Sequence, residues 1–388
     1  MMNKRWLKIT AAAVVSIGLQ QVKAQNTAPV NIVTTATPFL RISPDARGGA
    51  MGDANIAVSP DAYSGFWNAA KLPFAKSNGA IGLTYTPWLK DVANDVYLLT
   101  AGGYYKLDDQ SALHGGIRYF SLGQIQFTDD RGISQGGQNP RELSLEAGYS
   151  RKVSEHFGVS ATLRYINSSL MKGTINNTTY KAGTAVSGDI AAFYNGLDDN
   201  GQGFSAGLTI SNLGTKISYT NDPTSKAFLP ANLGLGGAYT WAIDEQNKFT
   251  LAADINHLLV PKYPTGLSGT DSATAVADYY SKGSFSGIGS SFSNGAYAVS
   301  GGGEYGYNDQ FFVRAGYHWA SENYGSNLRY FTAGIGLKYN VFGLNFSYLA
   351  PSGNALTRNP LSNTLRFSLI FDLGNIDGGE SSSSSRRY

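Results

Sequence analysis

The stretch FTAGIGLKYNVFGLNFSY, residues 331–348, decides the fold class, because large apolar residues alternate with small or polar ones on both sides of a short turn. In its first half Phe331, Ile335 and Tyr339 share one face, since successive side chains of a β-strand point to opposite sides. The second half repeats the pattern from Phe342 onward. The stretch therefore predicts an antiparallel hairpin with one apolar face and one polar face.

Strands of this kind recur along most of the chain. Most of them exceed about ten residues, which is long for a soluble β-sandwich and suits a strand that crosses a bilayer at a tilt. The alternation predicts fourteen strands, near residues 78–88, 94–107, 110–128, 141–153, 155–172, 184–195, 200–215, 231–243, 246–258, 294–306, 310–320, 328–340, 341–350 and 361–372.

The connections between these strands fall into two classes. Every second one is a tight turn such as DDQ, SEH or LDDNGQ, whereas most of the others are longer, up to the segment Leu259–Ser293. A soluble sandwich does not require this asymmetry, but outer-membrane barrels have short turns at one end and long loops at the other. We therefore expect an all-β transmembrane antiparallel barrel of about 14 strands, with periplasmic termini and extracellular long loops.

The composition agrees with a membrane environment. Only 15% of the residues are charged, against roughly 25% in ordinary soluble domains, and 24 residues are tyrosine. After residue 25, no run of about 18 apolar residues offers a spanning helix. Only helices and closed barrels satisfy every backbone polar group in hydrocarbon, so a barrel remains. We expect the outer membrane of a Gram-negative cell, with its lipid as a partner.

The N-terminus predicts a signal peptide over residues 1–24. The basic start MMNKRWLK is followed by the apolar run ITAAAVVSIGL and the small-residue exit VKA. The apolar run is too short for a transmembrane helix, the competing interpretation, which needs roughly 20 residues. Removing four of the 30 basic residues leaves 26 against 27 acidic ones, so the charge gives no reason to expect nucleic acid.

An irregular segment, FLRISPDARGGAMGDANIAVSPDAYSGFWNAAKLPF at residues 39–74, precedes the first strand and is too apolar for a disordered leader. We expect residues 25–76 to form a leader and a plug inside a barrel of residues 77–373, with a low-complexity periplasmic tail at 374–388. The predicted plug motif combines glycines suited to close approach, charged residues that could pair in the lumen, and their neighbours: Arg41, Asp45, Arg47, Gly48, Gly49, Gly52, Asp53, Asp61, Trp67 and Asn68.

The run ISPDARGGAMGDANIAVSPDAYSGFWNAAKL, residues 42–72, resembles the N-terminal signature of the PorV family of type IX secretion outer-membrane proteins, and more distantly that of the FadL fatty acid transporters. The elements that carry it are ARGGAMGDA, SPDAYSGFWN and NAAKL, where Ala69 replaces the proline of the wider family. That departure weakens any transfer of fatty acid transport to this chain. The resemblance extends from about residue 36 to Leu373 and implies a fourteen-stranded barrel with an N-terminal hatch.

For PorV-like proteins the resemblance also implies partners. They are the C-terminal signal domains of exported cargo, the large type IX translocon protein, and the sortase-like machinery that attaches cargo to the cell surface. The residues themselves offer no competing chemistry. With no cysteine and only four scattered histidines, we predict no catalytic residue, no metal site and no cofactor, and hence no enzyme.

Of two functions, we predict the first, in which the chain binds the C-terminal signal domain of cargo at the translocon and passes it to the attachment machinery, as the resemblance implies; transport is the alternative. In the first, the long loop binds cargo or translocon through aromatic residues that could also simply pack within it, namely Tyr263, Tyr279, Tyr280, Phe285 and Phe292. In the second, the chain transports a hydrophobic small molecule past the hatch and out through a kinked third strand, near Gly115, Gly116 and Gly123. An apolar lumen pocket would favour transport, and a polar, blocked lumen would favour partner binding.

Overall fold

The computed structural model describes residues 33–88, 95–128, 130–175, 177–222, 226–325, 328–352 and 364–374. The predicted signal peptide and residues 375–388 of the predicted tail lie outside these ranges. Within them, short helical elements precede a single closed barrel. None of the helices in these ranges is long and apolar enough to cross a bilayer.

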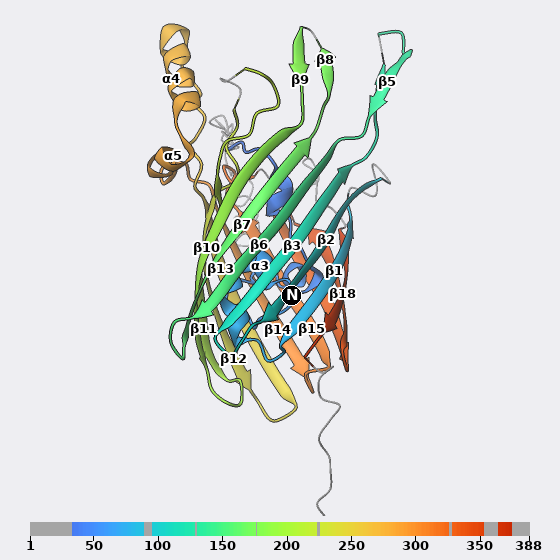
Figure 1. Cartoon of the computed structure of the whole chain (residues 1–388), viewed down its shortest axis with the longest axis vertical. Helices are drawn as coiled ribbons and strands as arrows, with labels where there is room; N and C mark the ends of the chain where they lie inside the picture. Colours follow the sequence, from blue (N-terminus) through green and yellow to red (C-terminus); the bar gives the residue numbers. More distant parts are fainter. Residues whose placement is uncertain are drawn as a thin grey trace, which may run out of the picture. The chain divides into compact units, whose positions relative to one another are not determined.

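Fourteen antiparallel strands close the barrel, which confirms the predicted fold class (Figure 1). Closure is made by the first and last strands, where Ile81 lies opposite Phe371. The strands are β1 Gly79–Pro87, β2 Val96–Lys106, β3 Ser111–Leu122, β6 Arg141–Lys152, β7 Phe157–Ser169, β10 Gly183–Leu197, β11 Gly203–Gly214, β12 Asn232–Ala242, β13 Asn247–Leu258, β14 Tyr297–Tyr307, β15 Phe311–Ala320, β16 Arg329–Tyr339, β17 Phe342–Pro351 and β18 Leu365–Asp372.

The short turns gather at one end of the barrel and the long connections at the other, as the turn pattern predicts (Figure 1). Two small hairpins extend the long-loop end, β4 Ile125–Thr128 with β5 Ser134–Gln138, and β8 Gly173–Ile175 with β9 Thr178–Tyr180. The N-terminal end of β1 and the C-terminal end of β18 both lie at the short-turn end, because the number of strands is even.

Several strand bounds differ by a few residues from the sequence prediction, and three differences concern the long connections. The predicted strand 110–128 is too long, because β3 ends before Gly123, which has a φ of +79° and could not carry a side chain beside Asp95. The predicted strand 155–172 ends at Ser169. The segment expected to be a plain loop contains two helices, α4 Gly269–Ser281 and α5 Ser284–Ser291. These three differences fall at the long-loop end, where the chain leaves the barrel wall.

The outer face of the barrel is apolar. Leu163 is 71% exposed and Leu235 is 56% exposed, although both lie in the middle of long strands. Near the long-loop end, the rings of Tyr85, Tyr97 and Tyr119 form a row with centroids 5.9 and 6.2 Å apart. An apolar band bordered by aromatic rings is the outer surface of a barrel in a membrane.

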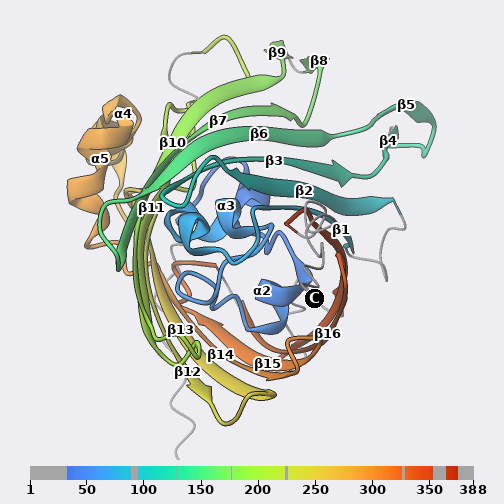
Figure 2. The same ribbon diagram turned by 60° about the horizontal axis from the view of Figure 1, so that its bottom comes forward.

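The N-terminal segment lies inside the ring of strands (Figure 2). It comprises η1 Pro38–Arg41, α2 Ala46–Ala50, α3 Ser64–Trp67 and η2 Ala69–Phe74. Small inward residues make room for it: a Cβ at Gly116 would lie 2.4 Å from the ring of Phe66. Charged side chains of the wall also point inward, so the lumen is both crowded and polar.

Candidate functional site

The candidate site is the interface between residues 33–76, called here the luminal segment, and the inner wall of the barrel. The segment contacts strands from several sides of the barrel, including β16 and β17 through α2 and β6 and β7 through η2. Most of its residues are buried, including Asp45, Asn55 and Lys71, which have no exposed surface. A polar segment at this depth needs hydrogen-bond partners, and these come both from the wall and from the segment itself.

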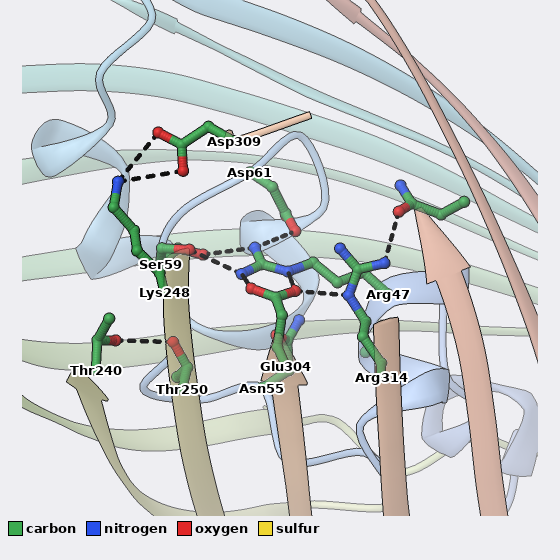
Figure 3. A network of polar contacts seen from close by, with 12 residues as sticks. Arg47, Asn55, Ser59, Asp61, Thr240, Lys248, Thr250, Glu304, Asp309 and Arg314 are labelled. Atoms are coloured by element: carbon green, nitrogen blue, oxygen red, sulfur yellow. Dashed lines mark hydrogen bonds and ion pairs between the residues drawn. The ribbon is translucent and has the colours of Figure 1, made fainter. Parts of the chain in front are cut away.

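Arg47 is the centre of a buried ion network that joins the segment to the wall (Figure 3). Its Nε and Nη2 atoms each lie 2.9 Å from the carboxylate of Glu304 in β14, and its Nη1 lies 3.1 Å from Asp61. Arg314 of β15 donates to the same Glu304 carboxylate at 2.6 Å. Burial opposes the charged guanidinium, but Glu304 and Asp61 outweigh it and raise the pKa of Arg47 above its usual value.

Glycines on both partners allow the two backbones to touch. Gly52 has a φ of +67°, and a Cβ there would lie 2.6 Å from the backbone nitrogen of Tyr317. On the wall, a Cβ at Gly302 would lie 2.3 Å from the carbonyl oxygen of Met51, and Gly316 meets the same backbone. Any side chain at these positions would separate the segment from β14 and β15.

Wall side chains also bind the backbone of the segment. Asp254 of β13 accepts hydrogen bonds from the backbone amides of Asn55 and Ile56 at 2.7 and 2.9 Å. Thr332 of β16 donates to the carbonyl of Ala50 at 2.8 Å. These contacts satisfy backbone groups that are far from water, so the wall determines the path of the segment.

The predicted plug residues separate into four groups in the structure. Arg47, Asp53 and Asn68 reach the wall; for example, Tyr330 donates to Asp53 at 2.5 Å. Gly49 and Gly52 lie against wall residues. Inside the segment, Asp45 caps α2 and accepts a hydrogen bond from the indole of Trp67, Gly48 lies against the Trp67 ring, and Asp61 bonds Arg47. Arg41 donates to the carbonyl of Tyr324, in the β15–β16 connection.

Sequence reasoning missed the residues on the wall side of this interface. Glu304, Arg314 and Asp254 lie on the inward faces of their strands, and each is at least nine-tenths buried. Their signal in the sequence is a charged residue on the polar face of an alternating strand. That signal marks the lumen but does not identify the partner.

Lys71 is a second residue that the sequence analysis did not single out. Its side chain is fully buried and its Nζ donates to the carbonyl of Asn55 at 2.7 Å. Burial lowers the pKa of Lys71 from 10.5 to about 8. Between these values the unfolded chain binds more protons than the folded chain.

The free energy of unfolding should therefore rise with pH between about 8 and 10.5. The pKa difference corresponds to about 3 kcal/mol over the whole window. Urea titrations in lipid vesicles, compared between the wild type and Lys71→Met, would measure this slope, because the other titrating groups are common to both proteins. Equal slopes in the two proteins would contradict the burial of a charged Lys71.

Disulfide cross-linking tests the position of the segment directly, because the chain has no cysteine. The backbone nitrogen of Ala46 lies 2.9 Å from the Oγ of Ser368 in β18, so Ala46→Cys with Ser368→Cys should form a disulfide. The closed chain should migrate faster than the reduced chain in a denaturing gel. The control pair, Ala46→Cys with Phe367→Cys, should not cross-link, because Phe367 faces outward and is 48% exposed. Equal cross-linking of both pairs would contradict the placement.

A cavity of about 110 Å³ remains between the segment and the wall. Arg41, Arg118, Asp53 and Asp254 contribute to its lining, together with Trp67 and amide side chains. Arg118 is held in place by the carbonyls of the segment, to which it donates at 2.9 and 3.3 Å. The cavity is thus mixed in character and rich in charge.

The five aromatic candidates of the long loop are placed in two different environments. Tyr263, Tyr279 and Tyr280 pack against one another, with ring centroids 5.1 to 6.4 Å apart, and Tyr279 also contacts Phe228. Phe285 and Phe292 are instead 70% and 63% exposed. The first three therefore build the loop, while the last two are available for contact.

The comparisons with known proteins agree with this architecture. A family model described as "Type IX secretion system protein PorV" matches residues 23–265. No curated protein matches the chain. Among solved structures, the toluene transporter TodX of Pseudomonas putida has a TM-score of 0.50 and 15% identity, covering 85% of this chain and 96% of its own. The toluene transporter TbuX of Ralstonia pickettii has a TM-score of 0.50 and 12% identity, covering 85% and 97%. At these identities the likeness concerns the fold alone.

Proposed function

The chain belongs to the PorV family of type IX secretion system proteins, and on this premise we propose that it transfers exported cargo from the translocon of that system to its attachment machinery. In this proposal it binds the C-terminal signal domain of the cargo at the large translocon protein and passes it to the sortase-like attachment machinery on the cell surface. It acts by binding and without catalysis.

One observation favours this proposal over solute transport: ion pairs and hydrogen bonds hold the luminal segment to the barrel wall. Residues 33–76 fill the lumen and are joined to the wall by Arg47, Glu304 and Arg314. We propose that the segment is a plug. Moving it would expose buried charges that lose their partners, at a cost of several kcal/mol. A barrel held closed in this way presents its surface, not its lumen, to partners.

The proposed orientation follows from the two ends of the barrel. Outer-membrane barrels place their short turns in the periplasm and their long loops outside the cell. The termini would then be periplasmic, and the two hairpins and α4 would face the exterior, where cargo emerges. We propose this long-loop end as the surface that binds cargo and translocon.

Transport of a hydrophobic molecule is the alternative, and the fold shared with the toluene transporters favours it. Two observations weigh against it. The cavity contains four charged side chains, whereas a hydrophobic ligand needs a mainly apolar pocket. The predicted wall kink near Gly115, Gly116 and Gly123 also lacks support, because β3 pairs without interruption with β2 and β6 at the first two positions and Gly123 lies beyond its last residue.

The deciding experiment is quantitative proteomics of the medium, cell surface and periplasm in a strain that lacks this gene. Under the secretion proposal, proteins that share a C-terminal signal domain accumulate in the periplasm and disappear outside, and a plasmid copy of the gene restores them. Unchanged export would refute the proposal. Uptake of radiolabelled toluene in the same strain would then test the transport alternative.

A further inference from the structure

The aromatic side of helix α5 faces away from the protein, whereas a helix in water usually packs its apolar side against the protein. Phe285, Ile288 and Phe292 lie within about 60° of one another around the helix axis, at 100° per residue. Both phenylalanines are mostly exposed. The buried positions are the small residues Gly287 and Ser291. A helix that packs its small residues inward and turns its aromatic residues outward is adapted to a surrounding that is not water.

The neighbouring helix α4 shows the ordinary arrangement and serves as an internal comparison. It buries Tyr279 and exposes the carboxylates of Asp271 and Asp278. Residues 284–293 contain no charged side chain. The two helices of one loop are therefore built for different surroundings, with α4 suited to water and α5 to an apolar phase.

The neighbours of α5 indicate which apolar phase surrounds its exposed side. Phe292 stacks on His257 with ring centroids 5.6 Å apart, and His257 donates to the carbonyl of Ser291 at 3.2 Å. His257 shares the outward face of β13 with Ile255, which is 53% exposed in the apolar band. Opposite His257 on β14 is Tyr297, whose ring pairs with Trp319 at 5.6 Å. The aromatic side of α5 thus continues the lipid-facing wall.

The views agree with this placement. Figure 1 shows α5 beside the long-loop ends of the strands, with α4 rising beyond them, and Figure 2 shows both helices outside the ring of strands. Aromatic rings at the end of a membrane barrel lie at the level of the lipid headgroups.

We propose that α5 is an interfacial helix that inserts Phe285, Ile288 and Phe292 into the outer leaflet of the membrane. The inference goes beyond the proposed function, because it concerns how the long loop is anchored and not what it binds. It assigns the two exposed aromatic candidates to lipid instead of a protein partner. With α5 held at the membrane surface, α4 is kept upright in water above it.

Spin-label accessibility tests this proposal in the intact protein, which offers no native cysteine to interfere. Nitroxides would be placed singly at Phe285→Cys and Phe292→Cys, with the protein in vesicles of phosphatidylethanolamine and phosphatidylglycerol. Ile255→Cys provides the lipid reference. Ala277→Cys on α4 and Ser286→Cys on the other exposed side of α5 provide the water references. Oxygen collects in lipid, whereas a nickel chelate stays in water, so their collision ratio reports the surroundings.

Labels at positions 285 and 292 should give an oxygen-to-nickel ratio close to that at Ile255 and several-fold above that at Ala277 and Ser286. A water-like ratio at both positions would overturn the proposal. Water-like labels that become shielded from both reagents only when the large translocon protein is added would also overturn it, in favour of a protein-docking surface.

Discussion

Replacing Arg47 with alanine is expected to lower the free energy that holds the luminal segment in place by about 3–5 kcal/mol. The substitution leaves Glu304 and Asp61 buried with fewer partners, and it removes the hydrogen bonds to Ser59. The direct measurement is hydrogen exchange at the amides of Asn55 and Ile56, which bond Asp254. Their protection should fall by roughly 100-fold or more, since every 1.4 kcal/mol is tenfold.

Lys248→Ala is the matched control for Arg47→Ala. Lys248 also pairs with a carboxylate, that of Asp309 at 3.1 Å, but the Asp309 side chain is 57% exposed (Figure 3). An exposed pair of this kind contributes about 1 kcal/mol or less, so exchange in the segment should not change. A cycle with Glu304→Gln adds a second check, because the double variant should lose less than the sum of the two single losses. Full protection in Arg47→Ala would refute the plug.

Shortening the long loop by replacing residues 265–290 with a brief glycine-serine linker is expected to abolish co-purification of cargo and translocon. The removed segment includes all of α4, which extends from the long-loop end of the barrel. The base of the loop should survive, because Asn294 donates to the carbonyls of Leu258 and Val260 at 2.8 Å and closes it below the deletion. Affinity capture with a tagged barrel, followed by mass spectrometry, measures the effect.

The control for the shortened loop is removal of the hairpin β4–β5, which is also exposed at the long-loop end. It should leave partner capture intact, and both variants should keep the heat-dependent gel shift of a folded barrel. Capture that persists in the variant without residues 265–290 would exclude this loop as the partner-binding surface. A combined Phe285→Ser and Phe292→Ser variant separates the roles of the two helices, because it affects α5 and leaves α4 unchanged.

The barrel wall could be predicted because its signal is local. Outward and inward residues alternate along each strand, so Phe331 and Ile335 on one face and Thr332 and Gly334 on the other indicate two faces without any knowledge of neighbouring strands. The turn residues added the order of short and long connections. In the long loop the same reasoning failed, because α4 and α5 are short and their helical pattern is weak beside the serines and glycines around them.

The residues of the luminal interface could be predicted on one side only. The glycines and charges of the segment stand close together in the sequence, and this density suggested a packed element. Their partners lie about 200 to 320 positions away, as with Asp254 for Asn55, Glu304 for Arg47 and Ser368 for Ala46. No periodicity relates residues at such separations.

The sequence by itself determined that this chain builds a membrane barrel of fourteen antiparallel strands, because period-two alternation and turn chemistry act between neighbours along the chain. Only the tertiary structure decided which inward charge meets which residue of the luminal segment, and which face of α5 continues the lipid-facing wall. Those pairings arise when the barrel closes, since closure brings distant strands around one lumen and excludes the water that would otherwise solvate their charges.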